Sequence, residues 1–285
     1  MTNPIAAVSA IAILGSANLH AELPQLTEKP FLGSFAALRN NSYQIIISPT
    51  GEIVINPIVN KGEVRPYVFI PVEWGIKITD KQGVESELKV LQETLESEQS
   101  ATDKLDATVI RGKTESGGEV ELTVETDRKS VEFKIKLLGT GTLDAATAKA
   151  AIFSRVQNYY QREEEQLSGK PEEFEELIKN DWLKVSRIDR SNKKFALADN
   201  VNAASDEVTG PGVQSFETEL GIIHNTYSFM AGSGAAMQLS NERFIRQAGA
   251  ASENAVPVHR GYDIVFTAAE EKTKSSENTL EVSFK

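Results

Sequence analysis

The chain has 285 residues, of which 40% are hydrophobic and 25% are charged, a composition typical of a globular protein rather than a disordered one. It contains no cysteine, which excludes disulfides, thiolate metal sites and cysteine nucleophiles. The 41 acidic residues outnumber the 30 basic ones, so the anionic backbone of a nucleic acid is disfavoured and we expect no nucleic-acid partner.

The N-terminus resembles an export signal. An apolar run over residues 5–15 is followed by small and polar residues that end at Ala21, although residues 1–4 carry no basic residue. A membrane-spanning helix needs about 20 apolar residues, and this run is shorter. We therefore expect a signal peptide over residues 1–21, no transmembrane anchor, and a periplasmic or secreted protein. The alternative is a buried N-terminal strand or helix of an intracellular protein.

Alternating apolar residues predict strands in the first half of the chain. Residues 43–47 and 53–55 alternate on either side of the turn sequence at 48–51, which predicts a β-hairpin. A further strand over residues 74–78 precedes a second turn sequence at 80–83. After this turn, the apolar residues in the segment 84–99 fit either a helix or irregular strands.

Residues 105–137 have the pattern of an antiparallel meander with one buried face. In the first strand, Leu105, Ala107 and Val109 are expected to face the core. The second and third strands are expected to bury their alternating apolar residues, Val120, Leu122 and Val124 followed by Val131, Phe133, Ile135 and Leu137.

Residues 144–167 have apolar residues at helical spacing, with Asp144 placed to cap the first turn. One face of this helix would contain Ala148, Ile152 and Val156. A short second helix is expected over residues 171–179, because proline is favoured at the first helical position. We therefore expect a helical insert near residues 144–179.

Strand patterns return after this insert. Residues 183–189 and 194–198 predict two strands joined by a turn, and residues 214–220 and 226–230 predict two more. The last two strands, 262–267 and 279–284, are expected to pair with each other as a closing hairpin.

These elements predict a mainly β protein, built as one large antiparallel β-sandwich domain over residues 22–285 with the helical insert at 144–179. Residues 118–133, in which apolar and polar residues alternate along two strands, are similar to the paired strands of galactose-mutarotase-like super-sandwich domains. Residues 182–185 and 193–198 resemble the periplasmic super-sandwich of bacterial membrane insertases, with a longer spacing between the tryptophan and the phenylalanine.

The mutarotase resemblance implies two histidines and a glutamate as catalytic groups, but it matches none of them to a particular residue here. Two candidate histidines remain after removal of the signal, His224 and His259, and neither belongs to a known histidine motif. Glu217 and Glu219 lie two residues apart on a predicted strand and would project to the same side, as a glycosidase pair requires. For the two histidines and for the two glutamates, the alternative is a purely structural role.

Oxygen ligands for a metal gather near residue 200, where Asp199, Asn202 and Asp206 lie close in sequence. This group departs from the calcium-loop pattern and lacks its glycine, so we assign no metal and no cofactor. Four aromatic residues are candidates either for stacking against sugar rings or for core packing: Tyr159, Tyr160, Trp182 and Trp74.

The leading hypothesis is an exported, non-catalytic β-sandwich protein that binds a polymer or protein partner in the cell envelope, such as a glycan or an envelope protein. The alternatives are a carbohydrate-active enzyme related to mutarotases and an intracellular structural protein. The oligomeric state does not follow from the sequence.

Overall fold

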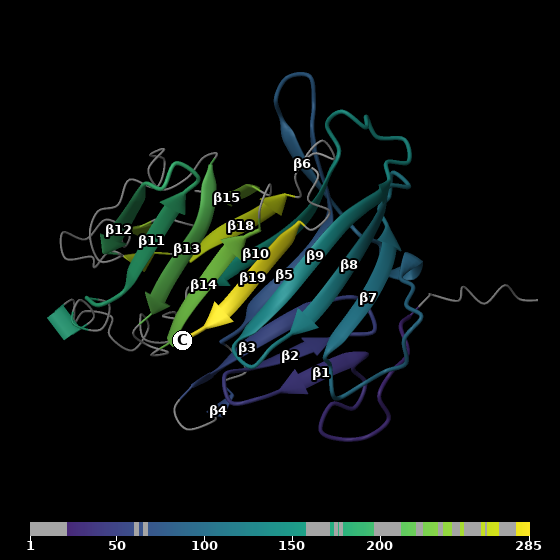
Figure 1. Ribbon diagram of the computed structural model, residues 1–285, viewed down its shortest axis with the longest axis horizontal. Coiled ribbons are helices and arrows are strands. Elements are labelled where there is room, and N and C mark those ends of the chain that lie inside the picture. The colour runs from purple at the N-terminus through teal and green to yellow at the C-terminus, as the bar shows by residue number, and fades with distance from the viewer. Residues whose placement is uncertain are drawn as a thin grey trace, which may run out of the picture.

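The computed structural model is a β-sandwich of two large antiparallel sheets (Figure 1). It describes residues 22–59, 63–64, 68–157, 172–173, 176, 179–196, 212–220, 225–232, 236–240, 246–247, 258–259, 261–267 and 278–285. The expected signal peptide at residues 1–21 lies outside these ranges. None of the helices in these ranges is long and apolar enough to cross a bilayer.

The first sheet places strands from both ends of the chain side by side. In order of pairing it contains β1 (Ala36–Arg39), β2 (Tyr43–Ile47), β3 (Ile53–Val59), β5 (Ile70–Thr79), β10 (Lys149–Gln157), β18 (Gly261–Thr267) and β15 (Ala236–Ser240). β6 (Glu85–Lys89) pairs with the distal half of β5, and β4 (Glu63–Val64) pairs with the end of β3. The β5–β6 hairpin projects beyond the sandwich (Figure 1).

The second sheet faces the first. In order of pairing it contains β7 (Ala107–Lys113), β8 (Glu119–Thr126), β9 (Ser130–Gly139), β19 (Thr279–Phe284), β14 (Asn225–Ala231), β13 (Val213–Leu220), β11 (Trp182–Arg187) and β12 (Asn192–Ala196). A 3₁₀ turn, η1 (Gln92–Thr94), precedes this sheet, and β16 (Arg246–Gln247) and β17 (Val258–His259) form a separate small pair.

The two sheets are also joined at both ends of the sandwich. At one end, Val213 of β13 pairs with Met237 of β15. At the other end, residues 102–105 bond to the outer edge of β1 through main-chain contacts with Phe35 and Ala37, and the chain then continues into β7. These contacts satisfy main-chain groups that would otherwise lie unpaired along β1.

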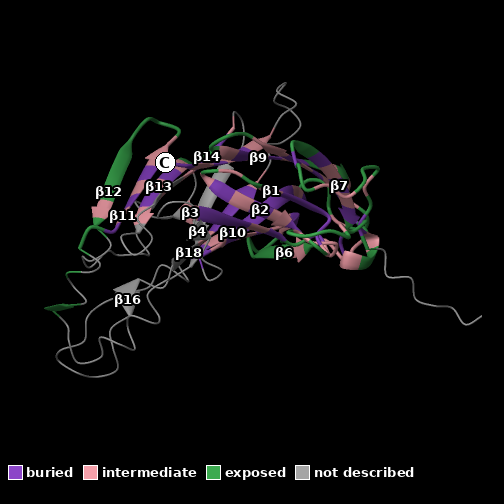
Figure 2. Cartoon of the chain, turned by 90° about the horizontal axis from the view of Figure 1, so that it is seen from below, coloured by how far each residue is buried: buried purple, intermediate pink, exposed green. Residues whose placement is uncertain are grey.

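The core lies between the sheets, and Figure 2 shows buried residues along the strands of both. The meander of β7, β8 and β9 is confirmed, and the predicted inward residues of β8 and β9 are buried except Leu137, which is partly buried and packs against the core. In the first strand of the meander Leu105 is buried as predicted, but the prediction was wrong for Ala107 and Val109, because Thr108 and Ile110 are buried whereas Ala107 is exposed. Cross-strand neighbours share a face, and Ile110 lies opposite the buried Leu122.

The helix predicted from residue 144 was wrong for the residues that the structure describes, because 149–157 form β10 in the centre of the first sheet. Asp144 caps a turn instead, where its Oδ1 accepts a hydrogen bond from the amide of Ala146. Within the second predicted helix, Glu172, Glu173 and Glu176 are helical, whereas Lys179 at its end lies in a turn.

The closing hairpin was also predicted wrongly. Both strands exist, but β18 pairs with β10 and β15 in the first sheet, and β19 pairs with β9 and β14 in the second. The turns at residues 48–51 and 80–83 are confirmed, and the glycine in each, Gly51 or Gly83, has the positive φ that the turn requires.

Candidate functional site

The outward side of the second sheet carries a group of charged and aromatic side chains around β11 and β13. Leu183, Val185, Phe216 and Thr218 are buried, so the residues that alternate with them point away from the core. We call the resulting surface the polar face, and it consists of Trp182, Lys184, Lys194, Glu217, Glu219 and Lys285.

Glu217 lies between two lysines at the centre of the polar face. Its Oε1 is 2.6 Å from Nζ of Lys285, and its Oε2 is 3.3 Å from Nζ of Lys184. The hydrogen bond from Lys285 is the largest influence on this carboxyl group, and together with Lys184 it holds the pKa of Glu217 below its ordinary value of 4.5. Glu217 is therefore ionised at neutral pH.

Glu219 and Trp182 form the neighbouring part of the polar face. Nε1 of Trp182 donates a hydrogen bond of 2.9 Å to Oε2 of Glu219, and the strand partners Trp182 and Glu219 are directly opposite each other. Nζ of Lys194 lies 4.0 Å from the centre of the Trp182 ring, within the range of a cation–π contact. The indole is thus oriented by a carboxylate at its edge and by an ammonium group on its face.

The two glutamates project to the same side of β13, as predicted. Phe216, which precedes Glu217, and Thr218, which lies between the two glutamates, are both buried on the other side. Their catalytic use is a different matter. A glycosidase pair needs one protonated carboxyl group as acid and one ionised carboxylate, and Glu217, whose pKa is lowered by Lys285 and Lys184, fits only the ionised role. Both side chains are held by neighbours, Glu217 by Lys184 and Lys285 and Glu219 by the indole of Trp182, an arrangement that suits the recognition of a polar ligand by fixed groups.

The side chains of the remaining predicted site residues lie outside what the structure describes. His224, Asp199, Asn202 and Asp206 lie outside the described residues. His259 belongs to β17, which pairs with β16, and the position of its side chain also lies outside what is described. Within the described ranges, no group of three or more histidine and acidic residues is arranged to hold a metal ion.

Three lysines of the polar face were missed by sequence reasoning: Lys184, Lys194 and Lys285. Alternation along 182–185 places Lys184 on the same side as Trp182, so this signal was present in the sequence. Lys285 is 68 residues from Glu217 along the chain, and only the pairing of β19 with β14 brings the two together.

Comparison with protein-family models found no match, and comparison with curated proteins found none either.

Proposed function

We propose that this chain is an exported, non-catalytic β-sandwich protein that binds a polymer or a protein partner in the cell envelope through its polar face. The observation that carries the proposal is the fixed charge pattern around Glu217, which two ammonium groups hold ionised at 2.6 and 3.3 Å. Such groups are already oriented before a ligand arrives, so binding costs little further ordering of side chains.

A glycan is the polymer whose chemistry fits this face best. Sugar hydroxyl groups donate to carboxylates such as Glu217 and accept from ammonium groups such as Lys184. The flat side of a sugar ring packs against aromatic rings, and Trp182 is the aromatic residue of the polar face. The lysines would add affinity for a glycan that carries acidic groups.

The test compares binding and turnover on the same samples. Purified protein is titrated with peptidoglycan fragments, an acidic polysaccharide and a neutral one, and is assayed on chromogenic glycosides and sugar anomers. The informative variant is Lys184→Ala with Lys285→Ala, which leaves Glu217 without its two ammonium partners. The control is Lys129→Ala with Lys136→Ala, which removes the same charge at exposed positions of another part of the second sheet.

We expect saturable binding without turnover, and a loss of roughly 10-fold in affinity for the informative variant, which corresponds to about 1.4 kcal/mol. The control variant should bind as the wild type does. Equal affinity in both double variants would reject the polar face as the binding surface. Turnover that is lost in Glu217→Gln would replace the proposal with a carbohydrate-active enzyme.

A further inference from the structure

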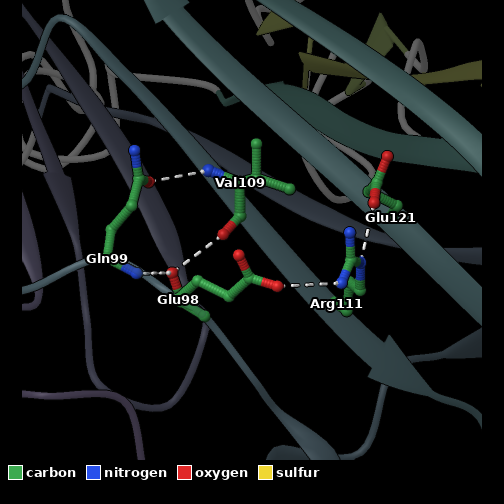
Figure 3. A network of polar contacts seen from close by, with 6 residues as sticks. Glu98, Gln99, Val109, Arg111 and Glu121 are labelled. Carbon is green, nitrogen blue, oxygen red and sulfur yellow. Dashed lines mark hydrogen bonds and ion pairs between the residues drawn. The ribbon is translucent and has the colours of Figure 1, made fainter.

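The outward side of the second sheet carries charge differently at its two ends. At the β7–β9 end, cations lie between carboxylates. The guanidinium of Arg111 lies 2.7 Å from a carboxylate oxygen of Glu121 and 3.6 Å from one of Glu98 (Figure 3). The ammonium group of Lys134 on β9 is likewise bound to two glutamates, at 2.8 and 3.1 Å. Here each of these cations is neutralised by more than one acid.

The polar face reverses this arrangement. Glu217 is a single carboxylate between two ammonium groups, and Lys285 at 2.6 Å is the closer partner while Lys184 at 3.3 Å is the looser one. The second glutamate of the face accepts a hydrogen bond from the indole of Trp182. Among the described residues, Lys194 has this indole as its partner instead of a carboxylate, with Nζ 4.0 Å from the ring centre. The polar face therefore carries an excess of positive charge, although the chain as a whole is acidic.

This excess lies on the β12 side of the polar face. Lys194 and Lys184 are directly opposite each other on β12 and β11. Like charges at opposite positions of a strand pair are destabilising, so stability does not account for the pair. Lys194 is exposed and the Lys184 side chain is 37% exposed, so a ligand can reach both. An anion between the two ammonium groups would replace their repulsion with two attractions.

A ring platform lies beside the two lysines. Trp182 is two residues from Lys184 along β11, on the same side of the sheet and about 7 Å away. Across the strand pair it lies opposite Ala196, which is small and exposed. A uronic acid is a sugar whose carboxylate is attached directly to the ring. One such unit can pack its ring against the indole and reach the two lysines with its carboxylate.

We propose that Lys194 and Lys184 form the subsite of the polar face that selects a uronic-acid glycan by its carboxylate. On binding, Lys194 exchanges the indole for the ligand carboxylate, and the sugar ring takes its place on the indole. An exposed cation–π contact is weak, whereas a charge-assisted hydrogen bond is about twice as strong as a neutral one, so the exchange is favourable. Glu217 keeps Lys285 as its partner while Lys184 turns to the ligand. The inference rests on the proposed function, because it names the class of glycan and the groups that select it.

The experiment compares two forms of one ligand on the full chain. The probes are oligomers of galacturonic acid and the same oligomers with every carboxyl group methyl-esterified, which keeps the ring and removes the charge. Affinity is measured by calorimetric titration, and access to the indole by acrylamide quenching of fluorescence. The chain has two tryptophans, and Trp74 is buried, so the quenching reports mainly on Trp182.

The variants separate the charge of Lys194 from its general presence. Lys194→Gln removes the ammonium group, and Lys194→Arg keeps a positive charge at the same position. The control Lys136→Gln removes an equal charge at an exposed position of β9 on the same side of the sheet.

We expect the acid form to bind the wild type about 10-fold more tightly than the ester, and to lower the quenching of the indole. In Lys194→Gln the two forms should bind with nearly equal affinity. Lys194→Arg should restore the preference for the acid form, and Lys136→Gln should retain it in full.

The outcomes distinguish this subsite from glycan binding in general. Saturable binding of both forms with equal affinity would leave the glycan site intact and reject the carboxylate subsite. Binding of neither form would also reject the subsite alone if the peptidoglycan fragments or the neutral polysaccharide bind, and it would reject the proposed function as well if they do not. A preference for the acid form that survives in Lys194→Gln would overturn the assignment to Lys194.

Discussion

Tyr43 shows how one side chain ties separate segments of the sandwich together. It is fully buried in β2, and its hydroxyl group lies 2.6 Å from the carbonyl oxygen of Asp127, in the turn after β8, and 2.8 Å from that of Ser130, the first residue of β9. Its ring stacks on Phe284 of β19, with 5.1 Å between ring centres. One residue of the first sheet thus contacts two strands of the second.

Burial raises the pKa of Tyr43 to about 12 from its ordinary value of 10.0, because the charged phenolate loses its hydration. The folded state therefore holds this proton more tightly than the unfolded state. The resulting stabilisation is fully present below pH 10 and is lost as the pH rises through the folded pKa of about 12.

We expect Tyr43→Phe to reduce the free energy of unfolding by about 1 kcal/mol at neutral pH, because the hydrogen bonds of the hydroxyl group are lost. Between about pH 8 and about pH 11, the variant should lose less stability than the wild type, since it has no phenol to titrate. Urea unfolding at the two pH values measures both effects. A parallel decline of the two proteins would show that Tyr43 is not the titrating group.

From the sequence, only those parts of the polar face could be predicted whose residues are close together along the chain. A period of two placed Glu217 and Glu219 on one side of a strand, and the structure agrees. The partners of these carboxylates depend on strand order. Trp182 and Lys285 reach β13 from different strands, and no local pattern states that β11 and β19 flank the β13–β14 pair.

At the scale of a single element, β10 explains why a strand was mistaken for a helix. Ala148, Ile152 and Val156 are four residues apart, a spacing that fits one face of a helix and equally the alternate positions of a strand. Ala151 and Phe153 on the opposite side are also buried, so the strand has apolar residues on both faces and lacks the alternation of its half-exposed neighbours. Its partners β5 and β18 are distant in sequence and left no local signal.

The β5–β6 hairpin depends on a glycine at a close approach of two main chains. A Cβ atom at Gly75 would lie 2.0 Å from the carbonyl oxygen of Leu88 on the paired strand. By contrast, a Cβ atom at Gly139 of β9 would have its nearest neighbour at 4.0 Å. Both glycines lie in strands, so they form a matched pair.

We expect Gly75→Ala to lower the free energy of unfolding by about 1–3 kcal/mol, because the two backbones must move apart. Gly139→Ala should change it by less than about 0.5 kcal/mol. Chemical denaturation of the two variants measures the difference. Similar midpoints for both would contradict the close contact between β5 and β6.

At the scale of the whole molecule, export remains a prediction from the sequence. The apolar run at residues 5–15 ends in small residues before Glu22, and Leu23 is the first buried residue of the described chain, with its amide bonded to the carbonyl oxygen of Pro49. We expect the mature protein to begin at Glu22. Mass spectrometry of the N-terminus from the native host tests this, and a cytosolic protein with an intact Met1 would contradict it.

The position of β19 sets the order in which the molecule can be completed. This strand lies between β9 and β14, so it joins the β7–β9 meander to the β11–β14 part of the same sheet. A chain that emerges gradually, from the ribosome or across a membrane, can pair β7 to β9 early, but the two parts of the sheet stay separate until residues 279–284 have emerged. Folding that waits for contacts so distant in sequence is slow. For a chain that is threaded across a membrane such a delay is useful, because the sandwich stays incomplete until residues 279–284 are available.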